Sequence, residues 1–383
     1  MRLGYQITGQ MNCLYLHIPF CRKKCSYCSF NSYADFDSLH PRYRRALSTE
    51  ISTGPELEGP LETIFVGGGT PTVLNFEDLA ALLGACREKY GFDADAEVSI
   101  EANPESVDYQ ILSVLRGEGF NRLSIGIQSL HDNELNTVGR VHDGAMAKKA
   151  VIEAGRAGFK NLSIDLMYGL PGQSAKSWHE TLQGALELGP RHLSAYQLSI
   201  EEDTPFHRMV EEGDLLMPAE DLVVEMDKIT RKLSAHAGLQ QYEISNFAQP
   251  GYECRHNLNY WRNGEYMGYG AGAVSFVGGV RDKRVADPLD YCQAVEQGGE
   301  LIVEKEALST IDSYKETVVM GLRLNSGISE SRLERRYGLD LREVYGASLD
   351  DLVDRGLILY DGVHLVLTET GRRFANQVMA ELV

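Results

Sequence analysis

The sequence predicts an α/β protein in which a partial (β/α)6 TIM-like barrel is followed by a smaller α+β domain. Short β-rich runs alternate with longer amphipathic runs from residue 13 to about residue 205. Six such repeats imply parallel strands joined by right-handed crossovers. After residue 205 the pattern changes, so we expect the 383 residues to divide into a barrel domain at 1–205 and a C-terminal domain at 206–383.

The predicted barrel strands are short runs rich in apolar and β-branched residues, bounded by polar residues or glycine. They are Cys13–Ile18, Thr63–Gly67, Glu97–Glu101, Arg122–Ile127, Asn161–Leu166 and His192–Leu198. Helical periodicity lies between them. It predicts helices that include Phe76–Lys89, Pro104–Glu118, Ala145–Ala157 and Ser174–Leu188.

Polar or glycine-rich groups follow every predicted strand, and barrel chemistry sits at the carboxyl ends of strands. The first strand runs into a cysteine loop. The later strand ends carry Gly67-Gly68-Gly69-Thr70-Pro71, Glu101, Gln128, Asp165 and Tyr196-Gln197. Each group alone fits a tight turn or a helix N-cap. Their recurrence at six successive strand ends favours a functional site.

The residues after 205 predict a mixed domain. We expect a helix at Ala219–Ala237 and a strand at Tyr242–Ser245, then helices at Tyr314–Leu322, Ser329–Tyr337 and Leu349–Arg355, strands at Ile358–Tyr360 and Val363–Leu367, and a final helix from Thr368. Three helices and a hairpin predict a small winged-helix-like unit at 306–383. Such units often bind DNA, but a net charge of −18 argues against a nucleic-acid partner.

Three thiols, Cys21, Cys25 and Cys28, follow the first strand with the spacing C-x3-C-x2-C. Thiolates are soft ligands suited to iron-sulfur clusters. A 4Fe-4S cluster held by three sulfurs keeps one iron open, and the amino and carboxylate groups of S-adenosylmethionine (SAM) can chelate that iron. A disulfide framework is a poor alternative, since we see no secretory signal and only seven cysteines. A structural zinc site would need a fourth ligand, and no second CxxC pair appears.

Composition agrees with an ordinary globular protein, at 43% hydrophobic and 24% charged residues. No apolar run is long enough to predict a transmembrane helix. The thiols, the acidic balance and the absence of a signal together predict a cytoplasmic protein. Peripheral attachment at a membrane is compatible with these features.

Several strings resemble the coproporphyrinogen III dehydrogenase-like family of the radical SAM superfamily, which also has the cysteine spacing. They are Leu14–Cys21, Gly67–Thr72, Glu101–Pro104, Ser124–Ser129, Gly139-Arg140, Asp165–Gly172 and the glycine-rich passage Gly264–Gly279. The resemblance implies a 4Fe-4S cluster on the three cysteines and a SAM molecule bound to it by Tyr15, Gly68 and Glu101. Where the family's dehydrogenase carries a second SAM, this chain has Gly69, Thr70, Gln128, Arg140 and Asp165.

Two departures from the dehydrogenase put oxidative decarboxylation of a porphyrinogen in doubt. A further cysteine two residues after the third ligand is replaced here by Phe30, and only about a dozen residues precede the first strand, in place of a long N-terminal arm. The string His256-Asn257-Leu258-Asn259-Tyr260-Trp261 resembles the mark of the family's haem chaperones.

We therefore expect haem contact at His256, Tyr260 and Trp261, since imidazole is a standard haem ligand and aromatic rings pack on porphyrins. Cys254 is an alternative ligand, and a purely structural hydrogen-bonding role for His256 is an equal alternative.

The favoured interpretation is a haem chaperone on a radical SAM scaffold that transfers haem to apo-haemoproteins, soluble or membrane-bound. The alternative is an oxygen-independent coproporphyrinogen III dehydrogenase or another radical SAM enzyme that modifies tetrapyrroles. Either protein needs an electron donor for the cluster. The sequence assigns no catalytic residue, allows a homodimer, and leaves open whether SAM is cleaved in turnover.

Overall fold

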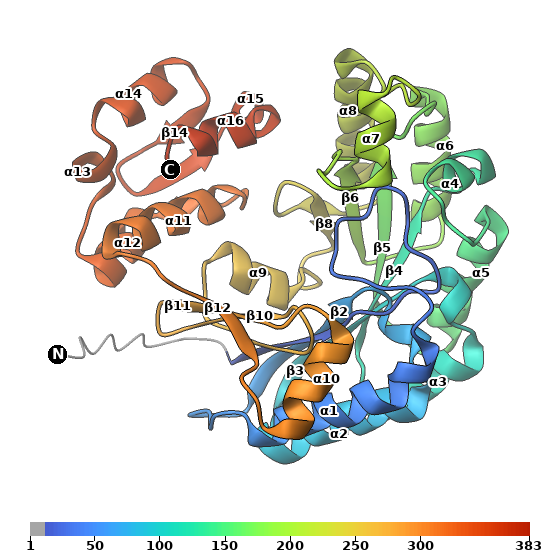
Figure 1. Ribbon diagram of the computed structural model, residues 1–383. Coiled ribbons are helices and arrows are strands. Elements are labelled where there is room, and N and C mark those ends of the chain that lie inside the picture. Colours follow the sequence, from blue (N-terminus) through green and yellow to red (C-terminus); the bar gives the residue numbers. More distant parts are fainter. Residues whose placement is uncertain (1–11) are drawn as a thin grey trace.

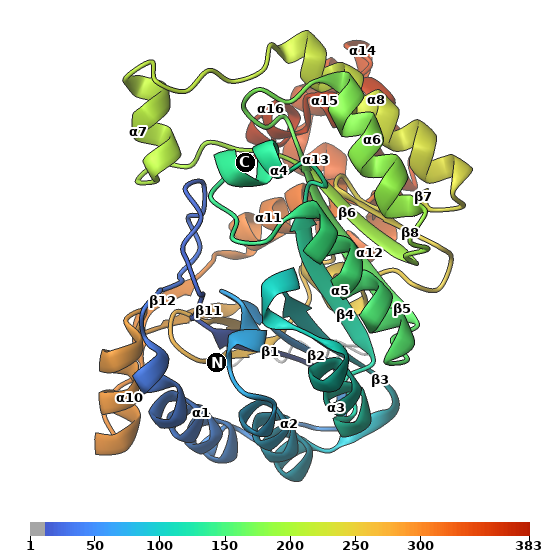
Figure 2. The ribbon, with the colours of Figure 1, turned by 90° about the vertical axis from the view of Figure 1, so that its right-hand side faces the viewer.

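The computed structural model describes residues 12–383 (Figure 1). The eleven residues before them belong to the predicted 1–205 domain and to the short segment ahead of its first strand, and they lie outside the described residues. One curved sheet carries helices on its outer side, and a smaller unit of C-terminal residues lies on the other side of the sheet (Figures 1 and 2).

The large sheet has nine strands within the described residues, in the order β7-β8-β6-β5-β4-β3-β2-β1-β9. Strands β1 to β6 and β9 run parallel, and β8 and β7 extend the sheet in antiparallel pairs. The bounds are β1 Cys13–Ile18, β2 Leu61–Gly68, β3 Phe92–Ala102, β4 Arg122–Gln128, β5 Asn161–Tyr168, β6 His192–Gln197, β7 Gln240–Gln241, β8 Asn246–Ala248 and β9 Met267–Tyr269. All six predicted strands are present, which confirms the α/β fold with an incomplete parallel barrel.

The sequence of β4 explains how this sheet separates its two faces. Side chains alternate along a strand. Leu123, Ile125 and Ile127 are fully buried in the apolar core, whereas Arg122 and Gln128 face a cavity inside the curve of the sheet. The neighbouring β5 repeats the pattern. The apolar face of the sheet is therefore covered by helices, and the polar face is free to line a site.

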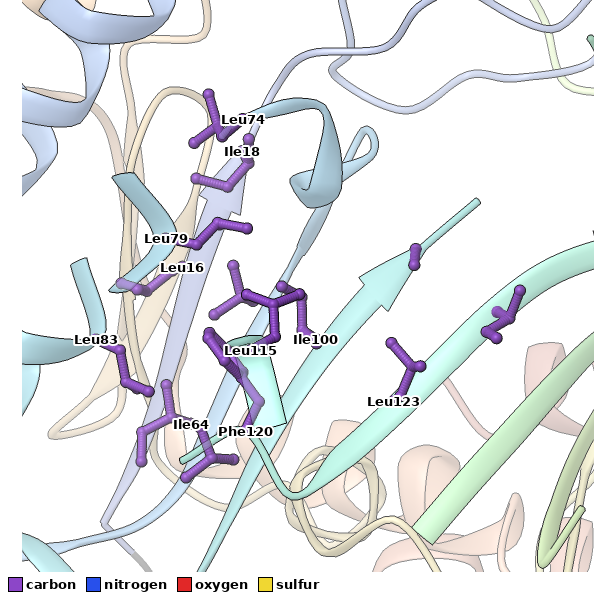
Figure 3. Close-up of a cluster of buried hydrophobic side chains, with 14 of the residues drawn as sticks. Leu16, Ile18, Ile64, Leu74, Leu79, Leu83, Ile100, Leu115, Phe120 and Leu123 are labelled. Carbon is purple, nitrogen blue, oxygen red and sulfur yellow. The ribbon is translucent and has the colours of Figure 1, made fainter. Parts of the chain in front are cut away.

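The core between the sheet and the helices is drawn in Figure 3. Leu16, Ile64, Ile100 and Leu123 project from four adjacent strands toward helix side chains such as Leu83. Burial of a side chain of this size contributes about 1.5–3 kcal/mol. This packing fixes the positions of the strand ends.

The helices of this part of the chain are α1 His40–Thr53, α2 Phe76–Tyr90, α3 Tyr109–Glu118, α4 Asp132–Thr137, α5 Gly144–Arg156, α6 Ala175–Leu186, α7 Pro205–Glu211 and α8 Glu220–His236, with 3-10 turns η1 Asp37–Leu39, η2 Pro71–Val73 and η3 Pro104–Ser106. Four of them, α2, α5, α6 and α8, follow their predicted ranges closely, whereas α1, α4 and α7 had no predicted range. Side-chain caps start several of them; for example, Asn75 accepts a hydrogen bond from the Asp78 amide at the start of α2. Within residues 12–383, no helix combines the length and the apolar character needed to cross a membrane.

One predicted helix, Pro104–Glu118, proves to be two elements. The turn η3 ends at Ser106, and Val107 is extended, with φ −135° and ψ 150°. Asp108 then caps a new helix by accepting from the Ile111 amide at 2.8 Å. The prediction missed this cap because Pro104 already looked like a helix start.

Segments after residue 205 complete the same sheet. Helix α9 Arg255–Trp261 and helix α10 Pro288–Gln297 accompany a second sheet made of β10 Val274–Val277, β11 Val280–Arg284 and β12 Ile302–Ala307. The predicted strand at Tyr242–Ser245 is wrong: these residues form the turn between β7 and β8. Glu243 stabilises that turn by accepting from the Ser245 amide at 2.9 Å.

The boundary predicted at residues 205 and 206 stays a prediction. Phe247, Met267, Tyr269 and Tyr291 pack in one core with the barrel strands. A later division, between β12 and α11, fits this shared core better.

The C-terminal unit has its own core, formed by residues between Tyr314 and Leu382. Its elements are α11 Thr310–Leu322, β13 Ile328–Ser329, α12 Glu330–Tyr337, α13 Leu341–Tyr345, α14 Ala347–Asp354, β14 Ile358–Tyr360, β15 His364–Leu367, α15 Glu369–Arg373 and α16 Ala375–Ala380. The three predicted helices and the hairpin are present, which gives the expected winged-helix-like arrangement. The last helix of that arrangement before the hairpin, α14, carries Asp350, Asp351 and Asp354 and so does not suit a nucleic-acid backbone.

Replacing Leu123 with Ala is expected to destabilise the protein by about 2–5 kcal/mol, because the side chain is fully buried between the sheet and the helices. Leu216→Ala is the matched control, since Leu216 is 81% exposed. Urea unfolding followed by circular dichroism measures both variants. Equal midpoints for the two would contradict the core described above.

Candidate functional site

A cavity of about 400 Å³ lies at the carboxyl ends of strands β1 to β6 and extends into the polar interior of the sheet. Most residues that the sequence predicts for a cluster and SAM line it: Cys21, Cys25, Cys28, Gly68, Gly69, Thr70, Glu101, Gln128, Arg140 and Asp165. Four predicted site residues do not line it: Tyr15, His256, Tyr260 and Trp261. The predicted site residues therefore lie in two different places, one group in the cavity and the other outside it.

The loop at 19–36, directly after β1, carries the three thiols. Its base is closed by the Cys21 amide, which donates to the Tyr33 carbonyl at 2.9 Å, and a turn forms where the Cys28 amide donates to the Cys25 carbonyl at 3.1 Å. The amide of Phe206 in α7 donates to the loop at 3.0 Å, and Figure 2 shows the loop reaching toward α7. Backbone bonds thus hold the thiol loop on two sides.

A side-chain network connects the thiols to the strand ends. The Thr70 hydroxyl donates to Cys21 Sγ at 3.6 Å, and one guanidinium nitrogen of Arg140 donates to Cys25 Sγ at 3.7 Å. Asn103 lies between them: its amide nitrogen donates to Thr70 Oγ1 at 2.7 Å and its amide oxygen accepts from Arg140. Two sulfurs therefore have donors suited to a thiolate.

The three thiols fit a 4Fe-4S cluster. Within the described chain, no three His, Cys, Asp or Glu side chains converge closely enough to hold a single metal ion. A cluster does not require such convergence, because each thiolate binds a different iron. The thiols are free of disulfides. A Cβ atom at Gly69 would stand 3.0 Å from Cys21 Sγ and 2.5 Å from the Phe20 carbonyl oxygen, so only glycine lets the backbone pass this close to the first thiol.

The seven thiols differ in their surroundings. Burial raises the pKa of Cys13, Cys86 and Cys254 to about 12, and none of these lines the cavity. Burial also raises the pKa of Cys21 and of Cys28, with hydrogen bonds from Thr70 and from the Phe30 backbone opposing the shift. The thiols that line the cavity are the three of the loop after β1, so any chemistry of thiols in this cavity belongs to them.

The glycine run at the end of β2 lies between two neighbouring side chains, Glu101 and His17, that hold it in place. The Gly68 amide donates to Glu101 Oε2 at 3.2 Å, and Gly68 has φ +119°, which other residues rarely adopt. A Cβ atom here would stand 2.7 Å from the His17 ring, which is held in turn by the Tyr15 hydroxyl at 2.9 Å. Tyr15 thus supports the cavity wall through His17. Burial, with a smaller contribution from the charge of Asp165, raises the pKa of Glu101 to about 7.

The ends of β4 and β5 present two further predicted residues. Asp165 accepts hydrogen bonds from Ser124 at 2.9 Å and from Ser163 at 3.2 Å, although burial raises the pKa of Asp165. Gln128 has φ +61° next to an irregularity in the β4–β5 pairing, and its amide oxygen accepts from Tyr196 at 2.9 Å. Such strained residues often stand at functional sites.

The H-N-x-x-Y-W string forms helix α9, and its histidine is fully buried. One ring nitrogen of His256 lies 2.8 Å from the Thr63 hydroxyl and the other lies 2.9 Å from the Tyr260 hydroxyl. Burial and then the charge of Arg122 lower the pKa of His256 to about 3. Trp261 packs under the guanidinium of Arg323 at 4.3 Å.

Neither nitrogen of His256 is free for iron in this arrangement, and the alternative ligand Cys254 is also fully buried. Haem contact at His256, Tyr260 and Trp261 stays a prediction that this geometry does not support. The structural role for His256, which the sequence kept as an alternative, agrees with its two hydrogen bonds.

Sequence reasoning did not assign Asn103, Arg122 or the pair Glu105 and His142 to the site. Asn103 follows Glu101 by two residues and Arg122 precedes Ser124 by two, so a strict period of two would have placed both on the cavity side. His142 bonds to Glu105 at 3.2 Å and to the Ile127 carbonyl at 3.1 Å. No local signal reveals that pair, because its members come from separate elements.

Comparison with protein families assigns residues 15–185 to the Radical SAM superfamily and residues 308–374 to the HemN C-terminal domain. Among solved structures, the coproporphyrinogen III oxidase HemN of Escherichia coli, described as a radical SAM enzyme, matches with a TM-score of 0.86 at 28% identity. That match covers 97% of this chain and 90% of HemN.

Curated relatives extend over nearly the whole chain. The heme chaperone HemW of Bacillus subtilis is 37% identical over 372 residues, which cover 96% of this chain and 98% of the relative. HemW of Mycobacterium tuberculosis is 37% identical over 98% of this chain and 96% of its own length. The mitochondrial radical S-adenosyl methionine domain-containing protein 1 of Bos taurus is 38% identical over 92% of this chain and 83% of its length.

Because the pKa of Glu101 is raised in the folded state, the free energy of unfolding of the ligand-free protein should depend on pH. The folded state keeps the proton up to about pH 7 and the unfolded state only to about pH 4.5, so stability is lost as pH rises through that window. Glu101→Gln is therefore expected to raise stability at pH 8 by up to about 3 kcal/mol and to have a much smaller effect near pH 4.5. Thermal unfolding at both pH values measures this.

Glu118→Gln, on the exposed surface of α3, is the control and should behave like the wild type at both pH values. A Glu101→Gln variant that gains nothing at the higher pH would contradict the buried, protonated carboxyl.

Proposed function

Because this chain belongs to the HemW family of radical SAM proteins, we propose that it binds haem and transfers it to apo-haemoproteins. The observation that carries the proposal is the near full-length similarity to proteins named heme chaperones, 37% identical over 98% of the Bacillus subtilis relative. The alternative, a coproporphyrinogen III dehydrogenase or related tetrapyrrole enzyme, is favoured by the structural likeness to HemN. Phe30 counts against that alternative.

We also propose that Cys21, Cys25 and Cys28 hold a 4Fe-4S cluster and that SAM occupies the cavity beside it. The free thiols and the close approach of the Gly69 backbone to Cys21 support the cluster. When bound, these groups supply one-electron reductive cleavage of a sulfonium. The proposed SAM contacts are Tyr15, through His17, and Gly68, Gly69, Thr70, Glu101, Gln128, Arg140 and Asp165.

The chain's own side chains prepare this cavity. Arg140 and the Thr70 hydroxyl direct N–H and O–H groups at two sulfurs and so favour their thiolate forms. Glu101 and Asp165 offer carboxylate oxygens at successive strand ends, where amino and hydroxyl groups of a ligand would find acceptors. Because position 68 is a glycine, the main chain can approach the same side of the cavity closely.

The proposed partners are haem, apo-haemoprotein acceptors and an electron donor for the cluster. Free thiols throughout the described chain fit a reducing, cytoplasmic compartment, which we propose as its location. Attachment at a membrane surface and a homodimer remain part of the proposal.

Replacing Cys21, Cys25 or Cys28 with Ala is expected to abolish the cluster in anaerobically reconstituted protein, because three ligands are the minimum set. Iron content, visible absorbance and the EPR signal of the reduced protein measure this. Cys86→Ala, in the apolar core, is the matched control and should retain the cluster. Normal iron content in the Cys25 variant would contradict the assignment of the three cysteines as cluster ligands.

The wild type is expected to bind haem and pass it to apomyoglobin, and to leave coproporphyrinogen unchanged in the presence of SAM and a reductant. Difference absorbance in the Soret region follows binding and transfer, and chromatography of the porphyrins follows turnover. Conversion of coproporphyrinogen would overturn the chaperone proposal in favour of the enzyme.

His256→Ala separates the two roles considered for that residue. Its two hydrogen bonds predict a loss of thermal stability with an unchanged Soret spectrum. A shifted Soret band in a variant of normal stability would instead identify His256 as an axial ligand.

A further inference from the structure

Arg122 is a buried cation that the proposed cluster and SAM contacts do not use. It begins β4, is only 2% exposed and lines the cavity. Within residues 12–383 no side-chain nitrogen of Arg122 has a hydrogen bond to the protein, no carboxylate lies within ion-pair distance of it, and its Nε is fully enclosed without a partner. A guanidinium has five N–H donors, and here the protein satisfies none of them.

The neighbouring polar groups are already occupied. Glu97 accepts from the amides of Arg255 and His256 at 3.1 and 3.2 Å, and Asp165 accepts from serine hydroxyls. His192 uses both ring nitrogens, on Ser163 and on Tyr242, each at 2.8 Å. Glu97 and Asp165 act on Arg122 through their charge, but none of these groups forms a hydrogen bond or an ion pair with its guanidinium.

The charge of Arg122 changes the pKa values of two nearby histidines. After burial, it is the second cause that lowers the pKa of His192 and of His256. Both imidazoles are therefore neutral beside a fixed cation. The inner end of the cavity thus holds a permanent cation, Arg122, to which no nearby histidine adds positive charge.

Asn257 is the member of the H-N-x-x-Y-W string that lines this cavity. Its side chain has no hydrogen bond to the protein in the described part of the chain, in contrast to His256 and Tyr260 of the same helix. A free amide and a free guanidinium in one cavity form a pair of donor groups.

The carboxylates of Glu97 and Asp165 offset part of the cost of burying this cation, but its N–H groups stay without hydrogen-bond partners, a cost that an anionic ligand bound directly to them removes. Carboxylate is the anion that a guanidinium fork matches in a bidentate way, and an amide N–H can add a third hydrogen bond. The cavity opens beside the exposed Lys23 and Lys24, which attract an anion to its mouth.

We propose that Arg122 and Asn257 form a carboxylate-binding subsite at the inner end of the cavity. The carboxylate belongs to a ligand that enters from the mouth: a propionate of haem, which rests on the proposed chaperone function, or the amino-acid carboxylate of a SAM molecule other than the one that would chelate the open iron of the cluster.

Paired ligands with and without the carboxylate test the subsite. The probes are haem against haem dimethyl ester, and SAM against decarboxylated SAM, each titrated into the reconstituted wild type, Arg122→Met and Asn257→Asp. In the wild type, loss of the carboxylate is expected to weaken one of the two ligands roughly tenfold or more, the factor that a charge-assisted hydrogen bond supplies. The part of that penalty that the subsite supplies should disappear in Arg122→Met. The control Arg335→Met, on the exposed face of α12, should retain it.

Asn257→Asp tests the subsite without removing the buried cation. Its new carboxylate pairs with Arg122 from within, so thermal stability should rise and the carboxylate-bearing ligand should weaken, while its ester or decarboxylated analogue should not. This variant keeps the test decisive if Arg122→Met fails to fold.

A penalty that depends on Arg122 and is confined to haem assigns the subsite to a propionate. A penalty that depends on Arg122 and is confined to SAM assigns it to an amino-acid carboxylate, whereas the part of the SAM penalty that persists in Arg122→Met reports loss of chelation at the cluster. Penalties that are absent in the wild type, or that persist unchanged in Arg122→Met and Asn257→Asp, overturn the subsite. The wild type could fail to bind haem and still bind SAM more tightly than decarboxylated SAM, with a preference that Arg122→Met reduces. That result would contradict the chaperone function and support the subsite.

Discussion

Side chains on successive residues of a strand point to opposite faces, and this period of two decides where the molecule keeps its charge. One face of the parallel sheet is apolar and packs against helices. The other face carries Arg122, Glu101 and Asp165, which line the cavity, and the buried Glu97. Charges in such surroundings are stabilised only by hydrogen bonds, opposite charges or a ligand. On each strand the apolar side chains point into the core, and the polar side chains that alternate with them are left to line the site.

Much of the barrel could be predicted from the sequence because its signals are local. Strand β1 was located to the residue. Of the predicted residues that line the cavity, Gly68, Glu101, Gln128 and Asp165 were found at strand ends and the three cysteines by their spacing, whereas Arg140 was found only by the family resemblance. Strand β9 could not be predicted, because three residues of a glycine-rich passage become a strand only by pairing with β1. Helix α9 was missed for a similar reason: its first amides bond to Glu97, more than 150 positions earlier in the chain. Long-range contacts, rather than propensity, define both elements.

The thiol loop and the strand ends form one electrostatic unit. Arg140 donates to Cys25, to Asn103 and to the Gly126 carbonyl, so one side chain joins the loop after β1 to the ends of β3 and β4. Burial acts against the charge of Arg140, but the nearby Tyr27 and Cys25 outweigh it, and the pKa of Arg140 lies above its ordinary value. The cation is therefore permanent. A fixed positive charge beside the sulfurs favours thiolate, which is the state that iron requires.

The string His256-Asn257-Leu258-Asn259-Tyr260-Trp261 acts here as a structural connection. Glu97 holds the amino end of α9, His256 bonds to Thr63 of β2, and Trp261 packs against Arg323 of the C-terminal unit. These contacts fix the helix between the barrel floor and the C-terminal unit and use up the groups that look most like haem ligands. They also present Asn257 to the cavity, where its amide has no partner among the described residues. The chemistry of a motif is thus decided by which of its members the fold leaves free, and in this helix the free member is the amide and not the imidazole.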